Sequence, residues 1–245
     1  MIINRFIKVI LLLLGGVFIV LQGLAYESEG AAVSALMLIL LTVLYCVWTP
    51  KKSRLFFWFL VVSAMGYLLG FLSWYMPRIE EGGTDYYYYG SNILFIISYL
   101  FLIIKIVSSF KLKEVFKGLA IPIIILLILD VFCVVLVSET TEAALTGSEY
   151  ALEYVYNAVI MALLSVALID YMYRNDTKSM LFLVGSICIV FSEIIQLAYY
   201  YILEDNSLGF VYSLFLVVAF LFFYLQSQLD ASDPEPFYMD EQLEV

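Results

Sequence analysis

The chain has 245 residues, of which 64% are apolar or aromatic, 14% are charged and none is histidine, and its net charge is −10 at pH 7. Soluble domains are about 45–50% apolar and about 25% charged, so this composition excludes a water-soluble globule of this size. The lack of histidine excludes catalytic triads, histidine-ligated zinc and imidazole general bases. We therefore expect an integral membrane protein.

The cysteines and the basic residues exclude further classes. Cys46, Cys133 and Cys188 each lie in a long apolar run without a CxxC partner, which indicates neither a disulfide framework nor a zinc site. Basic residues form no patch beyond short loops, which argues against nucleic-acid binding. We expect no metal and no cofactor.

Apolar runs long enough to cross a bilayer recur along the chain. A hydrocarbon core about 30 Å thick needs about 20 apolar residues in a helix, and the backbone groups must be satisfied inside it. We predict an all-α bundle of eight transmembrane helices that forms one domain over 1–227. The expected spans are 7–25, 32–49, 55–76, 91–110, 118–138, 150–173, 180–202 and 208–227.

Lysine and arginine residues in the short loops set the expected orientation. With these spans, all but one of the twelve basic residues lie on one face, and Arg78 is the exception. The loops on the opposite face are acidic. We therefore predict that both termini are cytoplasmic, and we expect the bacterial inner membrane.

Both ends of the chain carry their own expectations. Segment 1–25 has a basic start and an apolar stretch, as in a secretory signal peptide, but the stretch is longer than usual, so we expect a retained helix. Cleavage would leave seven spans. Segment 228–245 is acidic, and we expect a disordered cytoplasmic tail that is either simply solvated or binds a partner. Tyr86–Tyr89 precede span four, and we interpret this tyrosine run as an interfacial anchor at the headgroups rather than a ligand site.

Two carboxyl groups are expected near mid-depth. A charge at the bilayer centre costs about 2.5–3.5 kcal/mol, so such residues mark function by default. Asp130 lies about midway along span five and Glu193 about midway along span seven. Each is either a functional group or one side of a structural interhelical hydrogen bond.

Three other charged residues lie nearer to span ends. We expect Lys105 to snorkel to the interface and Asp170 to pair with Arg174 four residues later on the same helix. Glu153 is expected at the outer end of span six. We interpret these residues as interfacial rather than catalytic.

The residues around Glu193 predict a polar interior. Glu193, Gln196 and Tyr200 are spaced i, i+3, i+7, which puts them on one helix face. Span six contributes a second polar stripe with Tyr156 and Asn157. A polar space between spans six and seven follows.

Two short patterns resemble a known family. They are Tyr156-x3-Ile160-Met161 and, after a polar loop, Gly185-Ser186-x4-Phe191-Ser192-Glu193-x4-Ala198. This region resembles the YhhN-type integral membrane family, whose characterised members are lysoplasmalogenases. Eight spans in a chain of this length also fit that family. Glu193 stands where the family has an aspartate.

The resemblance implies hydrolysis of the vinyl ether of a lysoplasmalogen to a fatty aldehyde and a glycerophospho-alcohol. An acid must protonate the vinyl carbon and a base must deliver water, a task suited to two carboxyl groups. The family's second aspartate, in span three, is replaced here by Tyr67. The expected catalytic residues are therefore Glu193 and Asp130, and the ligand is a membrane lipid or lysolipid. The expected substrate-binding residues are Tyr67, Tyr156, Asn157, Ser192 and Gln196.

Two alternatives stay open. One is a non-catalytic relative that binds or senses a lipid. The other is a small proton-coupled transporter with Asp130 and Glu193 as protonation sites, although Pro122 alone is placed to break a helix. A retinal protein is disfavoured because Lys105, the one intramembrane lysine, lies near a helix end.

Overall fold

The computed structural model describes residues 2–77, 83–203 and 205–230, and within these it contains eight helices and no strand. Each helix is long and apolar enough to cross a membrane, which confirms the predicted all-α, multi-pass architecture. Arg78 and the tail beyond residue 230 lie outside the described residues. The helices are α1 (Ile2–Gly23), α2 (Glu27–Trp48), α3 (Arg54–Ser73), α4 (Tyr86–Val107), α5 (Leu112–Glu139), α6 (Gly147–Arg174), α7 (Thr177–Tyr201) and α8 (Asn206–Ser227).

Several helices begin a few residues before the predicted span, because a polar side chain caps them. Asp85 accepts hydrogen bonds from the Tyr87 and Tyr88 amides at 2.9 Å, so the tyrosine run forms the first turn of α4. Asp176 and Asp205 cap α7 and α8 in the same way. The hydrogen bond from the Ser207 amide lowers the pKa of Asp205. Capping therefore moves the boundaries but leaves the number of spans unchanged.

Seven of the helices close into a ring. They pack in the order α1–α2–α3–α4–α6–α7–α8, and α8 returns to α1. Gly209 on α8 allows the contact between α8 and α1, since a Cβ at this position would lie 2.5 Å from the Gln22 carbonyl oxygen of α1. The interior of this seven-helix ring is the central feature of the fold.

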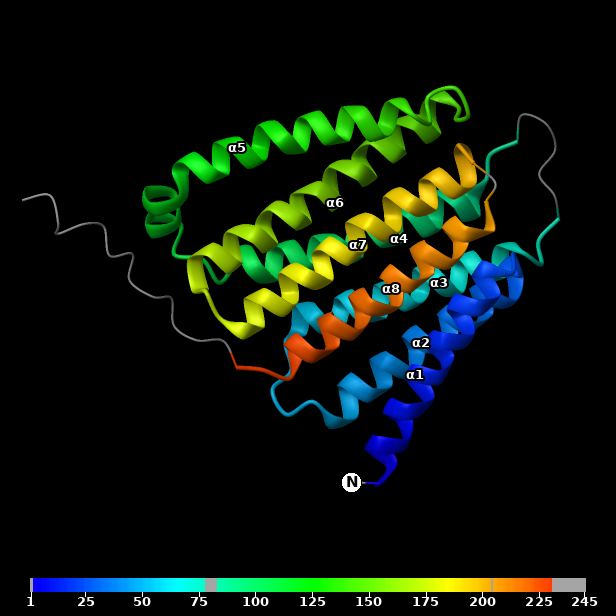
Figure 1. Cartoon of the computed structure of the whole chain (residues 1–245), viewed down its shortest axis with the longest axis horizontal. Helices are drawn as coiled ribbons and strands as arrows, with labels where there is room; N and C mark the ends of the chain where they lie inside the picture. Colours follow the sequence, from blue (N-terminus) through cyan, green and yellow to red (C-terminus); the bar gives the residue numbers. More distant parts are fainter. Residues whose placement is uncertain (1, 78–82, 204, 231–245) are drawn as a thin grey trace, which may run out of the picture.

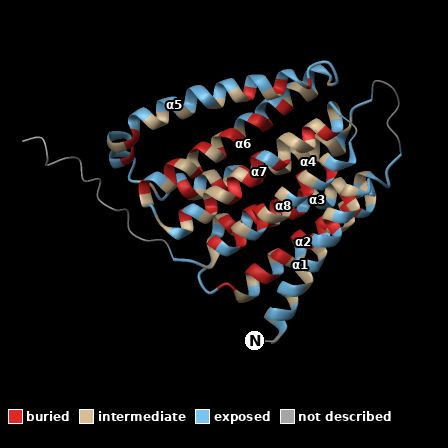
Figure 2. Ribbon diagram, in the orientation of Figure 1, coloured by how far each residue is buried: buried red, intermediate tan, exposed pale blue. Residues whose placement is uncertain are grey.

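Helix α5 lies outside the ring, against α6 and at the upper edge of the bundle in Figure 1. Only 6% of its membrane-crossing stretch is buried, compared with 44% for α7, and Figure 2 shows exposed residues along most of α5. A helix that is apolar on all sides suits contact with lipid. Leu119 has non-helical angles (φ −121°, ψ 21°), so α5 is kinked near its start, close to Pro122, the residue that the sequence placed to kink a helix.

Side-chain contacts bring the loops together at two ends of the bundle. At the basic end (loops 49–53, 108–111, 175–176 and 228–230), Lys51 Nζ donates to Asp230 at 2.8 Å, and this bond lowers the pKa of Asp230. At the opposite, acidic end, the Tyr199 hydroxyl donates to Glu27 Oε1 at 2.8 Å. The loops predicted to share a face therefore do share an end of the bundle.

Aromatic rings fill the ring interior toward the basic end. This aromatic cluster has centroid separations of 5.8 Å for Phe59 and Phe220, 5.6 Å for Phe59 and Phe223, and 5.4 Å for Phe182 and Phe223. Such edge-to-face and stacked pairs add to the packing energy of the buried surface. The cluster leaves the open space of the ring on its acidic side.

Candidate functional site

A cavity of about 300 Å³ occupies the ring interior between the aromatic cluster and the acidic end. All seven ring helices contribute to its wall, and α5 contributes no residue. Its polar lining consists of carboxyl, amide and tyrosine side chains, and no lysine or arginine is among the described residues that line it. The principal polar residues are Gln22, Glu27, Tyr67, Tyr88, Asn92, Glu153, Tyr156, Asn157, Glu193, Gln196, Tyr200, Tyr201 and Tyr212.

Glu193 lies at the inner part of this cavity. The Tyr99 hydroxyl on α4 donates a hydrogen bond to Glu193 Oε1 at 2.7 Å, and the Tyr156 hydroxyl on α6 is also beside this carboxyl. Three helices thus converge on one carboxyl group. Phenol donors stabilise a carboxylate without a cation, which matters where an unpaired charge is costly.

The helix face predicted from the spacing of Glu193 is present in the structure. Glu193, Gln196 and Tyr200 all line the cavity, as do Tyr156 and Asn157 on α6. Tyr156 and Asn157 are 5% and 7% exposed, so both are held by packing. The two polar stripes therefore face the same interior space.

Tyr67, at the position where the resemblance expects an aspartate, also lines the cavity. Its ring is packed edge-on against Phe95 (centroids 4.9 Å apart) and against Phe220 of the aromatic cluster (6.3 Å). The close approach of α3 to α4 at this point depends on Gly66, because a Cβ on Gly66 would come within 2.8 Å of the Phe95 ring. Tyr67 therefore forms the floor of the cavity, where the cavity meets the aromatic cluster.

The structure does not bring Asp130 to this cavity. Asp130 is on α5, outside the ring, where it accepts a hydrogen bond from the Ser165 hydroxyl of α6 at 2.8 Å. It is partly exposed at the α5–α6 seam, and it is not part of the cavity wall. The expectation that Asp130 is the second carboxyl beside Glu193 therefore has no support in the packing.

Ser192 also lies away from the cavity. Its hydroxyl donates to the Tyr212 carbonyl oxygen of α8 at 2.9 Å, and the residue is 1% exposed. One residue corresponds to about 100° around a helix, so the neighbour of an interior residue faces another helix. Ser192 thus joins α7 to α8.

Two cavity residues were missed or misplaced by the sequence interpretation. Glu153, expected at the interface, is 7% exposed, lines the cavity and lies beside Tyr88 and Asn157. Gln22 on α1 is 4% exposed, and its Oε1 atom has no hydrogen-bond partner among the described residues. The i, i+4 spacing of Glu153 and Asn157 was the sequence signal that Glu153 faces the interior. For Gln22, the signal was a single amide side chain in an otherwise apolar span.

The chain matches no protein-family model, and comparisons with curated proteins and with solved structures found no match. The described residues contain no group of three or more cysteine, aspartate and glutamate side chains able to hold a metal ion. The chemistry of the site therefore has to be argued from its carboxyl, amide and phenol groups.

Proposed function

We propose that the protein hydrolyses the vinyl ether bond of a lysolipid inside the membrane, with Glu193 as the acid. One observation carries the proposal: a carboxyl group held by Tyr99 and Tyr156 lies at the inner part of a polar cavity enclosed by seven apolar helices. The sequence resemblance to lysoplasmalogenases points to the same reaction.

The dimensions of the cavity suit part of an amphiphile. Its volume of about 300 Å³ is at the lower end of the usual range of about 300–1,000 Å³ for small-molecule sites. It can enclose a vinyl ether and the neighbouring glycerol carbons but not a whole acyl-length chain. Tyr67 and Phe95 offer apolar surface beside the carboxyl, while Gln196 and Asn157 offer hydrogen bonds.

The proposed chemistry uses two carboxyl groups on the cavity wall. Protonated Glu193 transfers its proton to the vinyl carbon that is not bonded to oxygen, leaving an oxocarbenium ion at the carbon that is bonded to oxygen. Glu153 takes a proton from a water molecule as the water adds to that ion. The hemiacetal then passes its hydroxyl proton to the departing ether oxygen, which gives an aldehyde and an alcohol, and the proton on Glu153 returns to Glu193 through water. The Tyr99 hydrogen bond stabilises the Glu193 carboxylate as it forms.

We propose the orientation from the same charge asymmetry that the loops show. The basic end faces the cytoplasm, and the cavity, nearer the acidic end, faces the other side of a bacterial inner membrane. The N-terminal helix α1 is retained, since Phe18 and Gln22 form part of the cavity wall.

A second candidate is a non-catalytic lipid-binding protein. The observation in its favour is Tyr67, which replaces the aspartate expected from the resemblance and is packed between two phenylalanine rings. In this role, Glu193 and its tyrosines would hold a lipid headgroup through hydrogen bonds. A transporter is less well supported, because the aromatic cluster fills the ring interior on the basic side of the cavity.

The test is aldehyde release from a lysoplasmalogen by the purified protein in detergent. We expect release by the unmodified chain and a loss of at least 100-fold in Glu193→Gln, which keeps the size of the side chain but removes the acid. The control is Glu142→Gln, the same change on the exposed loop between α5 and α6, which should release aldehyde at the unmodified rate.

Absence of release from the unmodified chain would contradict the hydrolase proposal. A lysolipid with a saturated ether then tests the second candidate, since it cannot be hydrolysed. Thermal stabilisation of the unmodified chain by this lipid, lost in Glu193→Gln, would support lipid binding alone.

A further inference from the structure

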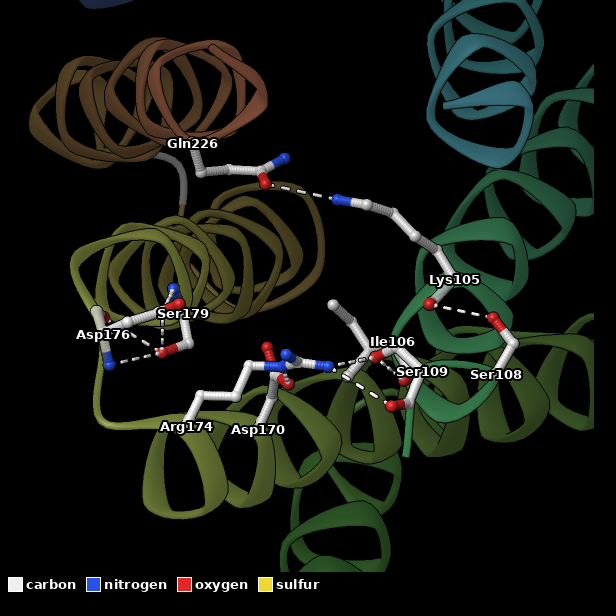
Figure 3. Close-up of polar contacts among 9 residues, drawn as sticks. All are labelled: Lys105, Ile106, Ser108, Ser109, Asp170, Arg174, Asp176, Ser179 and Gln226. Carbon is white, nitrogen blue, oxygen red and sulfur yellow. Dashed lines mark hydrogen bonds and ion pairs between the residues drawn. The ribbon is translucent and has the colours of Figure 1, made fainter. Parts of the chain in front are cut away.

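A second cavity, of about 120 Å³, lies at the basic end of the bundle, and it shares no lining residue with the cavity around Glu193. It is formed by the last turns of α4, α6 and α8 and the first turns of α7. Figure 3 shows its polar groups other than Lys178. The charged residues of its wall are Lys105, Asp170, Arg174 and Lys178.

Lys105 has no carboxylate partner among the described residues. Its ammonium lies 5.1 Å from the Phe56 ring centroid and 5.3 Å from that of Phe182, and it donates one hydrogen bond, to Gln226 Oε1 at 3.2 Å. An ammonium group has three donors, so this arrangement leaves donor capacity directed into the cavity. A cation inside a membrane bundle without an anion is unfavourable.

Asp170, the one carboxylate among the described residues of the cavity wall, already has an ion-pair partner. Asp170 Oδ1 accepts from Arg174 Nε at 2.9 Å, as the i, i+4 spacing predicted. Arg174 Nη2 is held in turn by the Ser109 hydroxyl at 2.9 Å. Among the described residues of the cavity wall, three cations therefore share one carboxylate, and Asp176 and Asp230 act on Lys178 from outside the wall.

Gln226 gives an independent sign that a ligand belongs here. It is 1% exposed, and its Nε2 atom, a donor, has no hydrogen-bond partner among the described residues. Figure 3 shows the amide oxygen of Gln226 bonded to Lys105, with Nε2 on the other side of the amide group. Leaving such a donor unsatisfied in a buried position is unfavourable, and an oxyanion that accepted from Nε2 would remove that cost.

We propose that this basic-end cavity binds a phosphate group, held by Lys105 and Gln226 with Arg174 and Lys178 at its rim. The volume of about 120 Å³ is several times the roughly 30 Å³ that a water molecule takes up in the liquid, so it has room for one tetrahedral oxyanion. Basic pockets between transmembrane helices are typical sites for phospholipid headgroups. The phosphate comes either from an anionic lipid or from a soluble phosphate, and both offer the same acceptor oxygens.

The experiment is thermal unfolding of the delipidated full chain in a neutral detergent. One arm adds inorganic phosphate and compares it with chloride at equal ionic strength. The other arm adds phosphatidylglycerol and compares it with phosphatidylcholine. A shift in the phosphate arm identifies a soluble anion and a shift confined to the lipid arm identifies a headgroup, and either shift supports the site.

Two variants test whether the shift comes from this cavity. Lys105→Met should raise the apparent dissociation constant at least tenfold, since it removes the charged donor. Lys113→Met, the same change on the exposed start of α5, should alter it less than twofold.

Gln226→Glu provides a second test of the site, which is needed if Lys105→Met does not fold. The new carboxylate would supply Lys105 with a built-in partner, so this variant should be more stable than the unmodified chain without ligand and should lose the ligand shift. The proposal is overturned if neither probe raises the unfolding temperature above its control, or if Gln226→Glu retains the full shift.

Discussion

The ring interior and the α5–α6 seam each hold a carboxyl group that the sequence places near mid-membrane, but the surroundings of the two groups differ. Glu193 lies on the wall of a cavity and accepts a hydrogen bond from Tyr99, on a helix far away in the chain. Asp130 lies at a two-helix contact and accepts one hydrogen bond, from Ser165. The first carboxyl is within reach of a ligand, while the second only joins α5 to α6.

This difference shows that depth in the membrane is a weak guide to function. Both residues carry the same cost of insertion, and either one could be read as a functional marker on that ground. What separates them is whether the helix belongs to the ring. A carboxyl group on a ring helix can face the enclosed space, as Glu193 does, while one on α5, which packs mainly against α6, is kept outside it.

Replacement of Glu153, the proposed second carboxyl group, should have the largest effect on activity and tests the difference between the ring interior and the α5–α6 seam. We expect Glu153→Gln to lower the rate of vinyl ether hydrolysis by about 10²- to 10⁴-fold, the range typical of a general base. Asp130→Asn, the matched amide change on α5, should leave the rate within about threefold of the unmodified chain. Initial rates of aldehyde release, measured at equal amounts of folded protein, decide between them.

A larger loss of activity in Asp130→Asn than in Glu153→Gln would identify Asp130, at the α5–α6 seam, as the second carboxyl group. If Asp130→Asn abolished release and Glu153→Gln did not, α5 would have to approach the ring interior in the active protein. Equal and small effects of both variants would leave Glu193 without a carboxyl partner.

Ring closure should be the next most sensitive feature. A methyl group at Gly209 would lie 2.5 Å from the Gln22 carbonyl oxygen, a backbone atom that cannot turn away. We expect Gly209→Ala to lower the free energy of unfolding by about 1–3 kcal/mol, as is typical of overpacked sites. Unfolding in mixed detergent micelles gives this value.

Gly16→Ala is the control for that change. Gly16 is also a helical glycine, on α1, and an added Cβ there would meet no atom within 4 Å. We expect no loss of stability. If both variants lost equal stability, the close contact between α1 and α8 would not be what closes the ring.

Much of the fold follows from local sequence signals. Runs of about 20 apolar residues predict the eight spans, and helical spacing predicts the shared face of Glu193, Gln196 and Tyr200. The pairing of Asp170 with Arg174 follows from the same periodicity. These features depend on residues close together in the chain, and so one sequence is enough to find them.

The position of α5 could not be predicted in this way. Its neighbours in the chain, α4 and α6, pack against each other and leave α5 outside. The hydrophobic periodicity of the sequence does not indicate which helices pack together. The mean hydropathy of 3.1 over its membrane-crossing stretch, the highest of the eight helices, was the one available signal. Glu153 was misplaced for a related reason, because a residue near a span end can still face an enclosed cavity.

The smallest expected effect concerns the Asp130–Ser165 bond itself. If the seam is structural, Asp130→Asn and Ser165→Ala should show a coupling of about 0.6 kcal/mol in a double-mutant cycle of unfolding, and less than about 1.7 kcal/mol, as for other interhelical hydrogen bonds in membranes. A coupling well above that range would place Asp130 in a tighter network than the one bond to Ser165 provides. A small coupling together with an unchanged rate of aldehyde release would mean that α5 is attached to the ring through weak polar contacts and packing, and that the function resides in the seven helices enclosing the cavity.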